Sequence, residues 1–284
     1  MKAPPFAYAK PRSLDETFTL LERHRDGAKL LAGGQTLLAT LNMRLSSPSI
    51  LIDITALPGL AGIAAQGTTV RIGALTRHRE IERSPVVAEH LPLLAQAAPH
   101  IAHVAIRNAG TLGGSLAHAD PAAEWPACCV ALDADIVLVS KEGERRVKAR
   151  GFFKALFETA LGADELIAAV EFPVLGTGYR SAFLELARRQ GDYAIVGVAA
   201  VARSTGGTFA DVRIAYIGGG STPILARNAM AAAEGKKPAP DVIAAAQTAL
   251  DRDLAPMGDL NGSPATKLHL ARVLCARALT QLAS

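Results

Sequence analysis

The sequence predicts an α+β protein of two domains. Its 284 residues are enough for two ordinary domains, and its even mix of apolar and polar residues is typical of a globular protein. Up to about Pro173, short apolar runs alternate with Gly-rich turns and helical stretches. Beyond Arg180, longer apolar runs joined by short turns precede helical patterns. The change across residues 174–180, VLGTGYR, marks the expected boundary.

The first region is predicted to mix strands and helices. Short apolar runs bounded by turn residues indicate strands, and they lie at residues 29–31, 50–54, 70–72, 136–139 and 166–172. A helical pattern begins near Thr36, directly after two adjacent glycines.

The second region is predicted to form a three-stranded antiparallel sheet followed by helices. The strands are expected at 181–187, 194–202 and 209–217, with short turns between them. One helix should have Pro223 in its first turn and end at Gly235, and another should cover 241–252. The last should have Ser263 as its N-cap before Pro264 and run to about Leu282.

Composition argues against several classes of protein. Cys128, Cys129 and Cys275 have no CxxC spacing, so they predict neither a disulfide framework nor a zinc or iron–sulfur site, and we expect them to be buried. A net charge of +4 without a Lys/Arg block gives little support for nucleic-acid binding. The longest apolar run, 194–202, is far shorter than the roughly 20 residues that span a bilayer. We therefore expect a cytoplasmic protein.

Residues 30–45, LLAGGQTLLATLNMRL, have the pattern of a phosphate-binding loop. A strand runs into Gly33 and Gly34 and then into a helix near Thr36, which leaves the N–H groups of residues 33–36 free. Glycine lets a phosphate approach the backbone, and a helix N-terminus favours negative charge. Such a turn also occurs for structural reasons alone, and neither the GxGxxG nor the P-loop spacing is present.

Residues 106–126, IRNAGTLGGSLAHADPAAEWP, have the same character. Thr111, two glycines and Ser115 lie close together, and two such loops can hold the two phosphates of one dinucleotide from opposite sides. Downstream, Asp120 and Glu124 could reach ribose or ribityl hydroxyls, or they could be solvated acids at a helix start. The residues alone leave both readings open.

Other polar patterns favour structural roles. The GGGS segment at 218–221 is expected to be a turn leading into a helix. His100, His103 and His118 have no carboxylate at metal-ligand spacing, so structural or solvent-facing positions are expected. Ser115 lacks the GxSxG elbow of a serine nucleophile.

Four segments carry a resemblance that covers the whole chain. They are AGGQTLLATLNMRL, IRNAGTLGGSLAHADPAAEWPA, TALGADELIAAVEFP and LARRQGDYAIVGVAA. In this order and spacing they resemble the flavoprotein subunit of the xanthine dehydrogenase and carbon monoxide dehydrogenase family of molybdenum hydroxylases. The resemblance implies a vanillyl-alcohol-oxidase or PCMH-type FAD-binding domain at 1–175, with subdomains at about 1–57 and 58–175. A C-terminal domain of the CO dehydrogenase flavoprotein type would follow at 178–284.

The resemblance also implies a set of FAD-binding residues. The first loop would contribute Ala32, Gly33, Gly34, Gln35, Thr36 and Leu37, and the second Thr111, Leu112, Gly113, Gly114 and Ser115. Near the adenosine or ribityl portion it places Ala102 and Glu124, with Asp120 beside them. Leu161 and Leu166 would lie along the cofactor, and Tyr193 beside the isoalloxazine.

Departures from the family pattern refine this picture. Gln35 stands where some members of the wider superfamily have a histidine that tethers the flavin, so non-covalent FAD is expected. Leu184 stands where xanthine-dehydrogenase-like enzymes can have a lysine near the flavin, which argues against an NAD-linked enzyme.

The resemblance implies partners. In the family, substrate is oxidised at a molybdenum–pterin centre on a large subunit, and [2Fe–2S] clusters on a small subunit pass electrons to FAD. This chain would be the FAD-binding electron-transfer subunit of such an oxidoreductase, in a dimer of heterotrimers, with no catalytic side chain or metal of its own. The alternatives are a self-contained FAD-dependent oxidase or dehydrogenase of a small organic substrate, and a scaffold protein that has lost the cofactor.

Overall fold

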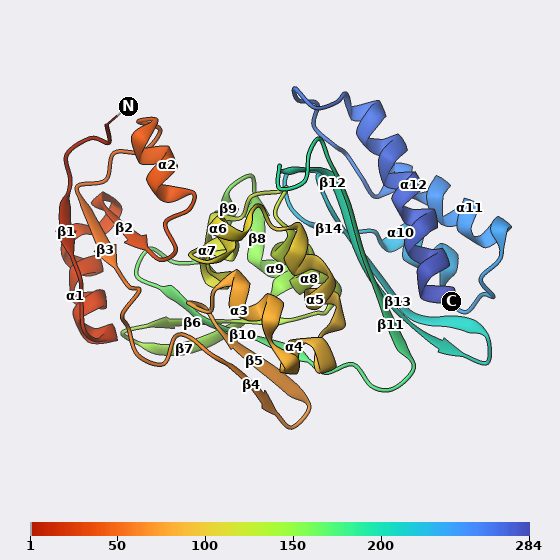
Figure 1. Cartoon of the computed structure of the whole chain (residues 1–284), viewed down its shortest axis with the longest axis horizontal. Helices are drawn as coiled ribbons and strands as arrows, with labels where there is room; N and C mark the ends of the chain where they lie inside the picture. The colour runs from red at the N-terminus through yellow and green to blue at the C-terminus, as the bar shows by residue number, and fades with distance from the viewer. Residues whose placement is uncertain (1) are drawn as a thin grey trace.

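The structure, a computed structural model, describes residues 2–284 and contains three main sheets (Figure 1). The first is parallel, with the order β1-β3-β2, and its strands are β1 (Ala7–Ala9), β2 (Ala28–Leu31) and β3 (Ile50–Asp53). Helix α1 (Leu14–His24) starts at Ser13, whose Oγ accepts the N–H of Glu16 at 3.1 Å. Its apolar face buries Phe18 against this sheet. The short helix α2 (Leu37–Asn42) follows β2.

The second sheet is antiparallel and is packed against short helices. Its order is β4-β5-β10-β6-β7, with β4 (Ile63–Gln66), β5 (Thr69–Gly73), β10 (Leu166–Pro173), β6 (Asp135–Ser140) and β7 (Gly143–Lys148). The helices are α3 (His78–Arg83), α4 (Pro85–His90), α5 (Pro92–Ala97), α6 (Val104–Arg107), α7 (Leu112–His118), α8 (Glu124–Ala131) and α9 (Ala149–Phe152). A small pair, β8 (Phe153–Ala155) and β9 (Glu158–Thr159), completes this part. Trp125, Phe152 and Phe172 are fully buried in its core.

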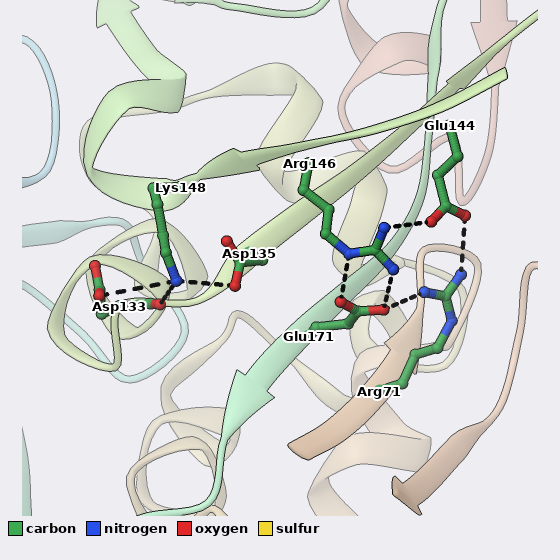
Figure 2. A network of polar contacts seen from close by, with 7 residues as sticks. All are labelled: Arg71, Asp133, Asp135, Glu144, Arg146, Lys148 and Glu171. Carbon is green, nitrogen blue, oxygen red and sulfur yellow. Dashed lines mark hydrogen bonds and ion pairs between the residues drawn. The ribbon is translucent and has the colours of Figure 1, made fainter. Parts of the chain in front are cut away.

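Ion pairs join the strands of this second sheet (Figure 2). Glu171 on β10 accepts hydrogen bonds from Arg71 on β5 at 2.6 Å and from Arg146 on β7 at 2.9 Å. Glu144 lies beside both arginines. The hydrogen bond from Arg146, followed by that from Arg71, holds the pKa of Glu171 below its usual value. Exposed pairs each contribute about 0–1 kcal/mol, so we assign this network to strand alignment.

The third sheet lies between two sets of helices. It is antiparallel, with β11 (Tyr179–Ala187), β12 (Ala194–Thr205), β13 (Thr208–Ile217) and β14 (Ile224–Leu225). Its outer face, with Val196 and Val198, packs on α10 (Arg227–Ala233), α11 (Pro240–Ala249) and α12 (Pro264–Ala283) (Figure 1). Its inner face, with Ala199 and Val201, joins the core that contains α5 and α8. Because helices cover both faces of this sheet, β12 has apolar residues at nearly every position.

The expected strands are all present, within a few residues of their predicted ends. Two predictions for the C-terminal part are wrong. The sheet has four strands, because Ile224 and Leu225 pair with β13. The helix expected at Pro223 therefore begins only at Arg227, and the GGGS turn leads first into β14. Ser263 is confirmed as an N-cap, with its Oγ 3.1 Å from the N–H of Thr266.

Three further observations bear on the sequence predictions. The three cysteines are fully buried, as expected. Between residues 2 and 284, no helix combines the length and apolar character needed to span a membrane. The predicted domain limits at 1–175 and 178–284 stay predictions, although the second and third sheets share a core across that boundary.

Candidate functional site

A cavity of about 880 Å³ lies where segments of all three main sheets and their connecting loops meet. This volume is near the upper end for small-molecule and cofactor sites. Its wall is formed by the loop after β2, the start of α7, the segment between β9 and β10, and the turn between β11 and β12. Segments that are distant in sequence therefore line one cavity.

The loop between β2 and α2 presents unpaired backbone donors. Gly34 has a φ of +70°, a left-handed conformation that glycine adopts without strain. Within residues 2–284, the N–H groups of Gly34, Gln35 and Thr36 have no acceptor. The side-chain amide of Gln35 instead donates to the carbonyl oxygen of Gly33 at 2.9 Å. Successive free N–H groups of this kind form an anion-binding turn.

The second glycine loop is built differently. The N–H groups of Leu112 and Gly113 donate to carbonyl oxygens just after β5 at 3.0 and 2.8 Å. The N–H of Gly114 donates to Oγ1 of Thr111, the N-cap of α7, at 3.2 Å. The two loops were expected to be alike, and this is wrong in one respect. The N–H groups of Leu112, Gly113 and Gly114 already have acceptors within the protein. From this loop Thr111, Gly113, Gly114 and Ser115 line the cavity.

The two loops touch each other. A Cβ placed on Gly33 would lie 2.3 Å from the carbonyl oxygen of Ala109 and 2.7 Å from the Cα of Gly110. A Cβ on Gly114 would lie 3.9 Å from that of Ala32. The close approach explains the glycine at 33 and brings both loops to one corner of the cavity.

Most residues predicted for the site line this cavity. They are Ala32, Gly33, Gly34, Gln35, Thr36, Leu37, Ala102, Thr111, Gly113, Gly114, Ser115, Asp120, Glu124, Leu161, Leu166 and Tyr193. Leu112 does not line it, because its side chain is fully buried in the core. The contact that each residue makes with a cofactor stays a prediction.

Two acidic side chains, Asp120 and Glu124, line one part of the wall, and Glu185 lies near Glu124 without lining the cavity. Burial, with a further contribution from the charge of Asp120, raises the pKa of Glu124 to about 7. Burial and the charge of Glu124 raise the pKa of Glu185 on β11 to about 8. The Oε2 of Glu185 is buried and has no hydrogen-bond partner among residues 2–284. Burial, Asp120 and Glu124 likewise raise the pKa of Tyr193, so these groups hold protons close to neutral pH or above it.

Several wall residues were missed by sequence reasoning. His78 lines the cavity and accepts the indole N–H of Trp125 at 2.9 Å. No spacing in the sequence links these two residues, which are brought together by the packing of α3 against the region around α8. His103 and His118, expected in structural or solvent-facing positions, also line the cavity. Among residues 2–284, no cluster of metal-ligating side chains is found.

Residues 4–175 match the family described as the FAD binding domain in molybdopterin dehydrogenase. The chain belongs to this family. Residues 181–282 match the CO dehydrogenase flavoprotein C-terminal domain. The resemblance found in the sequence is thus confirmed: the chain is an FAD-binding medium subunit of the molybdenum hydroxylase family.

Full-length relatives support this membership. The chain is 40% identical to the 6-hydroxypseudooxynicotine dehydrogenase complex subunit alpha of Paenarthrobacter nicotinovorans, covering 99% of this chain and 95% of the relative. It is 37% identical to the carbon monoxide dehydrogenase medium chain of Hydrogenophaga pseudoflava, covering 98% and 97%. A solved carbon monoxide dehydrogenase from Hydrogenophaga pseudoflava matches with a TM-score of 0.97 at 39% identity, covering 99% of this chain and 98% of that chain.

The cavity suits FAD chemically. Free N–H groups at Gly34–Thr36 fit a diphosphate, and the partly exposed apolar side chain of Leu161 fits the face of a flat ring. Tyr193, 63% exposed in the wall, offers an aromatic surface for stacking. The side chain of Gln35 is an amide, which cannot form the histidyl tether of covalent flavoproteins.

Proposed function

We propose that this chain is the FAD-carrying electron-transfer subunit of a molybdenum hydroxylase complex. It would pass electrons from [2Fe–2S] clusters on a small partner subunit through FAD to an external acceptor. The observation that carries the proposal is a large cavity in whose wall two glycine loops from distant segments touch. Family membership supplies the redox context.

The residues of the chain have defined tasks in this proposal. FAD, when bound, supplies the redox chemistry, and the protein supplies binding, orientation and local electrostatics. The N–H groups of Gly34, Gln35 and Thr36 would bind the diphosphate. Tyr193 would cover the isoalloxazine and limit its contact with water. Glu124, whose pKa is raised to about 7, would present to the ribityl or adenosine portion a carboxyl that is mostly neutral below this pH.

The partners follow from the distribution of cysteine. The three thiols of this chain are buried in α8 and α12, where they are not available to ligate an iron–sulfur cluster. The [2Fe–2S] clusters and the molybdenum cofactor would therefore lie on a small and a large subunit, in a dimer of heterotrimers in the cytoplasm. Within this chain, residues 1–175 would bind FAD and residues 178–284 would form the C-terminal domain.

The substrate is set by a partner in this proposal. Relatives at 40% and 37% identity have names that refer to a nicotine derivative and to carbon monoxide. Such different substrates at similar identity indicate that the groups selecting them lie outside the medium chain.

Purification of the chain with its co-expressed partners tests the function. We expect about one FAD for each copy of this chain, released by denaturation without proteolysis. Reducing the clusters should bleach the flavin absorbance in the assembled complex. Removing the small subunit should abolish this reduction while FAD stays bound. Substrate turnover by the isolated chain would instead favour a self-contained flavoenzyme, and a colourless complex would indicate a scaffold.

A further inference from the structure

His78 has a fixed tautomer. Its Nδ1 accepts the Nε1–H of Trp125 at 2.9 Å. An indole nitrogen can only donate, so Nδ1 of His78 carries no proton. The neutral imidazole must then carry its proton on Nε2. No residue among 2–284 accepts from that N–H. The Nε2 atom is not one of the fully buried polar atoms that lack a partner, so it has accessible surface although His78 as a whole is only 6% exposed, and His78 lines the cavity.

The surroundings keep His78 neutral. Burial, followed by the positive charge of Arg107, lowers its pKa to about 4. Arg107 is held beside it by Glu82 at 3.0 Å and by the carbonyl oxygens of Ile101 and Ala102. The imidazole is therefore an N–H donor without charge throughout the physiological pH range.

His78 is attached to the second glycine loop. Its backbone N–H donates to the carbonyl oxygen of Gly110 at 2.9 Å. A Cβ on Gly110 would lie 2.7 Å from the Nε2 of His78, and the Cα of Gly110 lies equally close to the Cβ position of Gly33. The imidazole thus lies against Gly110, at the corner where this loop touches Gly33 of the first loop.

The geometry points to His78 as a further cofactor-binding residue, whose Nε2–H donates to an anionic oxygen of the dinucleotide diphosphate. Trp125 is its positioning residue, because the indole N–H selects the tautomer that can donate. The Nε2–H makes no hydrogen bond within residues 2–284 and is free to donate to a ligand, and the diphosphate is the acceptor that the neighbouring amides also fit. This inference rests on the proposed function.

Paired substitutions separate the two nitrogens of His78. The assembled complex is stripped of FAD, and FAD is titrated back while quenching of its fluorescence is followed. In H78N the Oδ1 can still accept from Trp125, but the shorter side chain has no donor at the position of Nε2. We expect FAD binding to weaken about 10- to 100-fold, since a hydrogen bond to a charged acceptor contributes about 1.5–3 kcal/mol and 1.4 kcal/mol is tenfold. In H78Q the Nε2 donor is kept, and most of the affinity should return.

A double-mutant cycle tests the role of Trp125. W125F should weaken FAD binding in a chain that has His78, and should cause no further loss in H78N, because both changes act through the same donor. H100N is the matched control: His100 is half-buried beside Phe183, with ring centroids 5.2 Å apart, and does not line the cavity.

The outcomes distinguish the two claims. A wild-type complex that binds no FAD would contradict the proposed function itself. Wild-type affinity in H78N, in a complex that binds FAD normally, would overturn the inference alone. Equal losses in H78N and H100N would show that His78 acts only through stability. Additive losses of W125F and H78N would show that Trp125 does not act through His78.

Discussion

The glycines of the two loops serve different purposes. Gly33 and Gly113 are required by packing, because a Cβ there would lie 2.3 Å from the oxygen of Ala109 and 2.5 Å from the Cβ of Ala74. Gly114 has more room, since its Cβ would meet only Oγ1 of Thr111 within 3 Å. Substitutions at Gly33 would therefore disturb the fold together with any ligand, whereas Gly114 tests the ligand more directly.

Gly114→Asp should change stability and FAD binding in opposite directions. Position 114 is the third residue of α7 after the N-cap Thr111, where a carboxylate favours the helix. The same charge would repel a diphosphate, by about 4 kcal/mol at about 4 Å and an effective dielectric of about 20. We expect the variant to fold with an unchanged or higher Tm in the absence of FAD, and to lose FAD during purification.

Gly114→Asn is the control for this prediction, because it adds nearly the same volume without charge. Its flavin content, measured by absorbance after denaturation, should lie between those of the wild type and Gly114→Asp. Equal flavin content in the two variants would mean that charge plays no part and that no diphosphate lies nearby.

Glu124 should make FAD binding depend on pH. Burial raises its pKa to about 7, and the charged or titratable groups that face it are Asp120, Glu185 and Tyr193. A diphosphate nearby favours the protonated carboxyl, so the affinity for FAD should fall as pH rises through about 7. Fluorescence titration at pH 6 and pH 8.5 measures this.

Glu124→Gln should remove that part of the pH dependence and bind FAD at pH 8.5 as the wild type does at pH 6. Since the folded pKa is raised, ionisation of Glu124 also lowers wild-type stability as pH rises between the unfolded and folded pKa values. A pH profile of the variant identical to that of the wild type would assign the titration to another group.

At the residue scale, the sequence predicts the loops but not their partners. Adjacent glycines between a strand and a helix are a local signal, and both loops lie in the cavity wall. His78, Trp125 and Glu185 give no such signal, because their significance depends on hydrogen bonds and burial between segments distant in the chain.

At the scale of elements, apolar strands were predictable and polar or very short ones were not. Strand β12 has the apolar run expected of a strand covered on both faces. Strand β7, with the sequence GERRVK, has almost no apolar side chain and is almost fully exposed. Strand β14 has only two residues, and its pairing with β13 is a tertiary contact.

The turn between β11 and β12 positions Tyr193 in the wall. Gly191 in this turn has a φ of +88°, and a Cβ there would lie 2.3 Å from the imidazole of His103. We expect Gly191→Ala to displace the turn and weaken FAD binding in the assembled complex, as measured by fluorescence titration. Adding His103→Ala should restore only part of the affinity, because the backbone strain remains. Full restoration would mean that the steric contact alone matters.

At the scale of the whole molecule, the cavity exists because three sheets are packed together. The inner face of the third sheet shares a core with α5 and α8. This packing places Tyr193 and Glu185 near Glu124 at the start of α8. The overall α+β class and the family were predictable, since four motifs occur in a specific order. The cover on the inner face of the third sheet was not predictable, because it comes from α5 and α8, which are distant in the sequence.

An experimental structure of the FAD-bound complex tests the central claim most directly. We predict that the diphosphate lies within hydrogen-bond distance of the N–H groups of Gly34, Gln35 and Thr36, against the bare face of Gly114. A diphosphate elsewhere on the chain, with both glycine loops free of ligand, would contradict the account.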